Sequence, residues 1–137
     1  MSSSLLVAAS AAVVLLLGGV HLFYTFASDR FQPRERDVEE RMRAVSPVLT
    51  RQTTMWKAWV GFNASHSLGA ILFGLVYGYL AVWHQAFLFG SPFLLALGGA
   101  ALLGYLVLAK RYWFRVPLRG IALSFVLYLV GVIVGLR

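Results

Sequence analysis

The sequence contains no cysteine and few charged residues, and each scarcity excludes a class of protein. Without cysteine there are no disulfides, no thiolate metal ligands and no thiol nucleophile. Charged residues make up 12% of the chain and apolar residues 60%, whereas soluble domains carry about a quarter charged residues. This composition excludes an ordinary soluble domain and predicts an integral membrane protein.

Acidic residues are confined to one short segment, since all five of them lie between Asp29 and Glu40. Proton relays and ion-coupling sites need an acid at depth in the membrane, and the long apolar runs contain none. The sequence therefore argues against a pump or an ion-coupled transporter. It also lacks a nucleophile–base–orienter constellation, a glycine-rich phosphate loop and an EF-hand pattern, so nothing in it points to an enzyme.

Four apolar stretches are long enough to cross the hydrocarbon core as helices, which takes roughly 20 residues each. They comprise about residues 5–27, 56–83, 92–109 and 120–136. No positively charged segment precedes the first stretch, so we expect a retained helix and not a signal peptide. The predicted fold is all-α, a single transmembrane domain over residues 1–137 that forms an integral membrane four-helix bundle.

The basic residues predict the orientation of this bundle. Eleven of the twelve lysines and arginines lie in or beside residues 28–55 and 110–119, and the twelfth is Arg137. By the positive-inside rule these two segments face the cytoplasm, so both termini lie on the outer side (N-out, C-out). With this placement, the net charge of +7 indicates a membrane surface and not a nucleic-acid partner.

The cytoplasmic loop 28–55 is predicted to contain a short amphipathic helix on the membrane surface. Pro33 suits a first helical position. Apolar side chains then recur at helical spacing between charges, at Val38, Met42 and Val45, before Pro47 ends the pattern. A docking surface for a partner protein is the alternative.

The second basic segment interleaves cations with aromatic rings, a composition typical of the lipid headgroup layer. We expect lipid headgroups to contact Arg111, Trp113, Arg115 and Arg119. The alternative, a specific anionic-lipid or nucleotide site, is not demanded by any residue.

Small residues repeat at intervals of four on the second and fourth predicted helices. Such spacing lets helix backbones approach closely where no hydrophobic effect draws them together. We expect some of these faces inside the bundle, and one on the fourth helix available to a neighbouring protein. The series are Gly61, Ser65 and Gly69; Gly74 and Gly78; Gly120 and Ser124; Gly131 and Gly135.

Two histidines lie inside the predicted spans. His21 is one turn from Thr25 on the first helix, and Asn63 and His66 share a face of the second. At about 1.5 Å per residue, His21, Asn63 and His66 lie at similar depth in the inner leaflet. A ring nitrogen in hydrocarbon needs a partner. The cluster is therefore either a hydrogen-bonded clasp between two helices or a binding site.

As a binding site the cluster has three interpretations. Ligation by His21 or His66 would suit the iron of a b-type haem or the magnesium of a (bacterio)chlorophyll. Two imidazoles and an amide without a carboxylate are an incomplete set for zinc or iron, so no site for a bare metal ion is predicted. A quinone or a lipid head needs only hydrogen bonds and fits these side chains best.

Two stretches carry a resemblance to a known family: residues 19–26 (GVHLFYTF) and 61–69 (GFNASHSLG). They resemble an uncharacterised family of small four-helix bacterial inner-membrane proteins. Members often have glycine directly before the first histidine, where this chain has Val20. The resemblance implies a compact bundle in a bacterial cytoplasmic (inner) membrane, and it implies no activity.

The predicted function is that of a small non-catalytic membrane protein, an accessory or structural subunit of a larger complex. Its expected partners are membrane lipids and other membrane subunits. The alternative is a membrane protein that holds a quinone, a lipid head, a haem or a (bacterio)chlorophyll at the His/Asn cluster. A structural clasp should be colourless and tolerate His21→Gln, whereas a ligand site should not.

Overall fold

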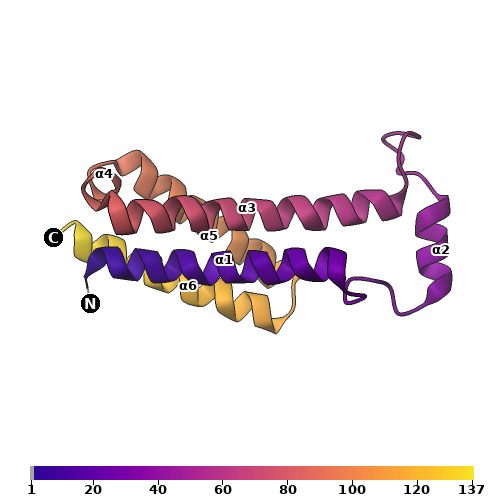
Figure 1. Cartoon of the computed structure of the whole chain (residues 1–137), viewed down its shortest axis with the longest axis horizontal. Coiled ribbons are helices and arrows are strands. Elements are labelled where there is room, and N and C mark those ends of the chain that lie inside the picture. Colours follow the sequence, from indigo (N-terminus) through magenta and orange to yellow (C-terminus); the bar gives the residue numbers. More distant parts are fainter. Residues whose placement is uncertain (1) are drawn as a thin grey trace. The chain divides into compact units, whose positions relative to one another are not determined.

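The computed structural model describes residues 2–137, and all regular structure in that range is helical. The helices are α1 (Ser3–Ala27), α2 (Arg36–Ala44), α3 (Met55–Trp83), α4 (Gln85–Phe89), α5 (Pro92–Tyr112) and α6 (Arg115–Gly135) (Figure 1). Four of them, α1, α3, α5 and α6, are long and apolar enough to cross a membrane. The prediction of an all-α protein with four candidate spans is confirmed, and it indicates a multi-pass membrane protein.

The chain divides into two compact units. Unit 1 comprises the residues up to Leu17 together with Ala70–Arg137, and unit 2 comprises Gly18–Gly69. Helices α1 and α3 each contribute a segment to both units.

Unit 1 has one apolar core to which α1, α3, α5 and α6 all contribute. Leu88 of the short helix α4 is also fully buried there, so α4 packs against the same core. The buried apolar residues of this core are Val7, Ala11, Val14, Ala70, Phe73, Tyr77, Ala81, Leu88, Leu95, Leu102, Ile121 and Tyr128.

Two glycines of unit 1 allow α1 to lie close to both α3 and α6. A Cβ atom on Gly74 would lie 2.8 Å from the Ala11 carbonyl oxygen, and one on Gly131 would lie 3.0 Å from the Ser3 carbonyl oxygen. Both positions therefore bring helix backbones together, as the small-residue spacing predicts.

A reciprocal pair of serines also joins α1 to α6. The Ser10 hydroxyl donates to the Ser124 carbonyl oxygen at 2.8 Å, and the Ser124 hydroxyl donates to the Ser10 carbonyl oxygen at 3.0 Å. Both side chains are 0% exposed. Because each hydroxyl is satisfied by the facing helix, the pair can be buried in an apolar environment without an unpaired polar group.

The connection between α5 and α6 is shorter than predicted. The sequence predicts a loop over residues 110–119, whereas α5 continues to Tyr112 and α6 begins at Arg115. Pro117 is the third residue of α6, in the first turn, where its missing N–H needs no acceptor within the helix. The expected helix start at residue 120 is wrong because this proline is part of the helix and does not precede it.

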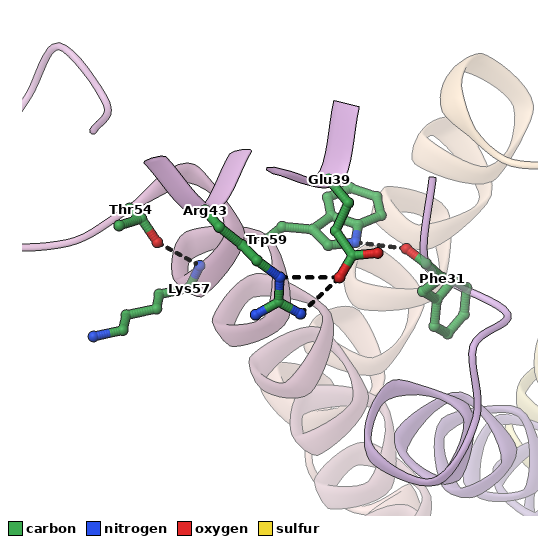
Figure 2. A network of polar contacts seen from close by, with 6 residues as sticks. All are labelled: Phe31, Glu39, Arg43, Thr54, Lys57 and Trp59. Atoms are coloured by element: carbon green, nitrogen blue, oxygen red, sulfur yellow. Dashed lines mark hydrogen bonds and ion pairs between the residues drawn. The ribbon is translucent and has the colours of Figure 1, made fainter. Parts of the chain in front are cut away.

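In unit 2, α2 and its two connections join α1 to α3. Helix α2 begins at Arg36 and not at Pro33, and Figure 1 shows it running across the ends of the α1 and α3 segments of the same unit. Thr54 caps α3, since its hydroxyl accepts a hydrogen bond from the Lys57 N–H at 3.3 Å (Figure 2). The Met55 N–H donates to the Val45 carbonyl oxygen at 2.9 Å, which closes the connection between α2 and α3 at its base.

Candidate functional site

The predicted His/Asn cluster lies in unit 2, and three of its four side chains meet there. His21 Nε2 lies 3.0 Å from Asn63 Oδ1, and the rings of His21 and His66 are in edge-to-face contact with centroids 5.2 Å apart. The fourth residue, Thr25, donates its hydroxyl hydrogen bond to the His21 carbonyl oxygen at 2.8 Å. Thr25 is therefore bonded to its own helix, and the other three form the contact between α1 and α3.

The amide of Asn63 determines which nitrogen of His21 carries the proton. Asn63 Nδ2 donates to the Trp59 carbonyl oxygen at 2.8 Å, which leaves Oδ1 facing His21. An amide oxygen is only an acceptor, so His21 Nε2 is the donor in this bond. While the bond is made, Nε2 has no lone pair to offer to a metal, and only Nδ1 of the neutral ring keeps one.

The contact between the two rings does not fit a bis-histidine macrocycle site. Axial ligands lie on opposite faces of a macrocycle, each with a metal–nitrogen bond of about 2 Å. The rings of His21 and His66 are in edge-to-face contact at an interplanar angle of 73°. This contact leaves no space for a macrocycle between the two rings. Throughout residues 2–137, moreover, no three His, Cys, Asp or Glu side chains gather in a way that could hold a metal ion.

Phe31 and Trp59 complete the cluster, and the sequence does not single them out for this role. The ring of Phe31 packs against the His21 imidazole with centroids 4.4 Å apart. Trp59 Nε1 donates to the Phe31 carbonyl oxygen at 2.9 Å, which ties the connection after α1 to α3 (Figure 2). The one available signal is that Phe31 is the only aromatic residue between positions 28 and 55.

A small cavity adjoins the cluster. It is lined by α1, the connection that follows it and α3, with Thr25, Ser28, Trp56 and Asn63 among its walls, and its volume is about 30 Å³. That volume admits one or two water molecules. A quinone ring or a porphyrin would not fit without a rearrangement of α1 against α3 within this unit.

Ser67 lies one helical turn after Asn63 and is hydrogen-bonded to its backbone. Its fully buried hydroxyl donates to the Asn63 carbonyl oxygen at 2.9 Å. Ser65 instead donates to the Phe62 carbonyl oxygen and is exposed. Of the two serines that flank His66 in sequence, only Ser67 is therefore buried.

The predicted lipid-headgroup residues lie in unit 1, around the connection between α5 and α6. Arg111, Arg115 and Arg119 are all exposed. Trp113 is half-buried, and its ring faces that of Tyr105 with centroids 6.3 Å apart. The three guanidinium groups are therefore accessible to a headgroup layer, whereas Trp113 also contributes to packing.

No protein-family model, no curated protein and no solved structure matches the chain. The resemblance of residues 19–26 and 61–69 to a family of inner-membrane proteins stays a prediction.

Proposed function

We propose that this chain is a small non-catalytic integral membrane protein that serves as an accessory or structural subunit of a larger membrane complex. The observation that carries the proposal is the pair of hydrogen bonds that joins His21 to Asn63 and Asn63 to the Trp59 carbonyl oxygen, beside a cavity of about 30 Å³. Such a cluster is suited to hold the α1 and α3 segments of unit 2 together. The adjoining cavity is small for a quinone, a haem or a pigment.

The exposed small-residue face of α3 supports a neighbouring protein helix as the partner. A Cβ atom on Gly61 would have no other atom within 4 Å, and Ser65 one turn later is exposed. In a membrane, small residues at this spacing favour close helix–helix contact. Because no other part of unit 2 packs on Gly61, this face is available to a second protein.

The same proposal includes an orientation and a location. We place both termini on the outer side of a bacterial inner membrane, with α2 on the cytoplasmic surface. The distribution of basic residues supports the orientation, and the resemblance noted above supports the location. Val38 and Val45 of the α2 region are 42% and 50% exposed, which suits an apolar face resting on lipid.

The test is purification from the native membrane in mild detergent, with an absorbance spectrum and mass spectrometry on the same sample. We expect a colourless protein accompanied by other membrane subunits in fixed ratio. The variant His21→Gln should behave in the same way, because a glutamine amide can still donate to Asn63 Oδ1.

Two controls separate the clasp from a ligand site. His21→Leu removes the donor and should loosen unit 2, which limited proteolysis of the α1–α2 connection would detect. A Soret band, a pigment band or a stoichiometric quinone that disappears in His21→Gln or His66→Ala would contradict the proposal and establish a binding protein instead.

A further inference from the structure

The connection between α2 and α3 is an ordered loop with an apolar tip. Its base is closed by the Met55 N–H bond to the Val45 carbonyl oxygen, at 2.9 Å. At its far end the Thr50 N–H donates to the Pro47 carbonyl oxygen at 3.2 Å, the hydrogen bond of a β-turn over residues 47–50. Figure 1 shows this loop projecting beside the first turn of α3.

The two central residues of this turn are apolar, which is uncommon for a turn exposed to water. Such positions usually hold glycine, proline, asparagine, aspartate or serine, whereas here they are Val48 and Leu49. These side chains are 109% and 93% exposed, the largest values among the exposed large apolar residues described. Two apolar side chains exposed side by side at a projecting turn are a candidate contact surface.

The charged residues from the loop onward are all basic. No acidic residue follows Glu40 in the sequence, whereas Arg41, Arg51 and Lys57 flank the loop and are exposed. Arg43 is already engaged, because it donates to Glu39 at 2.7 Å and lies 4.4 Å from the centre of the Trp56 ring. Lys57 extends away from that ion pair (Figure 2). A projecting apolar tip flanked by cations is complementary to an anionic bilayer surface.

We propose that Val48 and Leu49 insert into the headgroup region of an anionic lipid bilayer, with Arg51 and Lys57 beside the lipid phosphates. The tip adjoins the start of α3, a candidate span, so it lies where a bilayer interface would be. Trp56 and Trp59 in the first turns of α3 are residues that such an interface favours. This inference does not depend on the proposed role as an accessory subunit.

The natural absence of cysteine makes a direct test practicable. The full chain with the single substitution Leu49→Cys is labelled with an environment-sensitive fluorophore and reconstituted at low protein density into vesicles. One set of vesicles contains phosphatidylcholine alone and the other contains phosphatidylglycerol as well. We expect blue-shifted emission from the label and quenching by lipids spin-labelled near the headgroup, both stronger with phosphatidylglycerol.

Gln52→Cys is the matched control, since Gln52 is an exposed polar residue of the same loop outside the turn. Its label should stay closer to water in both vesicle types. Adding Arg51→Gln or Lys57→Gln to Leu49→Cys should each lower the preference for anionic lipid about fivefold.

Three outcomes would overturn the inference, wholly or in part. A label at position 49 as water-exposed as the label at position 52 in anionic vesicles would exclude insertion. Protection of Leu49→Cys only in native membranes would indicate a protein partner instead. Equal insertion in neutral and anionic vesicles would remove the proposed role of the cations.

Discussion

Adding one methyl group at each of two glycines of α5 should affect stability differently. Gly98 is buried, and a Cβ atom there would lie 2.7 Å from Cε1 of Tyr77 and 2.7 Å from Cζ of Tyr128. Gly104 is exposed, and a Cβ atom there would have nothing within 4 Å. Both residues lie within the same helix, so the substitutions Gly98→Ala and Gly104→Ala are chemically matched.

The two tyrosine rings at Gly98 are held in place. The Tyr77 hydroxyl donates to the Leu94 carbonyl oxygen at 2.7 Å, and the Tyr128 hydroxyl donates to the Leu95 carbonyl oxygen at 2.9 Å. Neither ring can move away from a new methyl group without losing a buried hydrogen bond. A methyl group at position 98 would therefore overpack the core around the two tyrosine rings.

The magnitude follows from two opposing effects. Replacing glycine by alanine inside a helix gains about 0.5–1 kcal/mol, and overpacking a core costs typically about 1–3 kcal/mol. We expect Gly104→Ala to be neutral or stabilising by up to about 1 kcal/mol. Gly98→Ala should lower the free energy of unfolding by up to about 2.5 kcal/mol, the overpacking cost less the helix gain.

Unfolding in mixed micelles with increasing dodecyl sulfate, followed by circular dichroism, measures both variants on one scale. Adding Tyr128→Phe to Gly98→Ala removes the hydroxyl oxygen nearest to the new methyl group, so the double variant should be more stable than additivity predicts. If both alanine variants shifted the unfolding transition equally and in the same direction, the close packing of α5 on the tyrosines would be refuted.

Two further predictions concern helix contacts. A double-mutant cycle with Ser10→Ala and Ser124→Ala should give a coupling energy of about 0.5–1.5 kcal/mol, since the two hydroxyl oxygens lie 2.8 Å apart, within hydrogen-bond distance of each other. A coupling near zero in the same micelle assay would contradict the reciprocal pair. Gly61→Leu should leave the unfolding transition nearly unchanged, because nothing lies near that position, yet it should reduce the recovery of partner subunits from native membranes. Undiminished recovery would exclude the Gly61 face as the contact surface.

Part of the candidate site could be predicted from the sequence. A histidine in an apolar helix must find a polar partner, so His21 and Asn63 could be expected to meet once α1 and α3 were neighbours. The roles of Phe31 and Trp59 could not be expected, because Trp59 donates to a backbone carbonyl. Every residue carries a carbonyl, so side-chain pattern does not reveal which one is used.

The sequence by itself determined that the protein is helical and that four segments can cross a membrane. A helix that crosses hydrocarbon must be long and apolar, with its backbone hydrogen bonds satisfied internally, and that requirement is visible in the sequence alone. It did not determine the start of α6, because Pro117 is compatible with either a loop or a first helical turn.

Only the tertiary structure decided which helices touch and which glycines matter. A membrane helix is apolar on all sides, so no stripe of apolar residues marks the face that packs against a neighbour. Gly74, Gly98 and Gly131 meet neighbouring helices, whereas Gly61 and Gly104 face open space, although all five occupy similar apolar surroundings in the sequence. The difference arises from helix position and rotation, which packing determines.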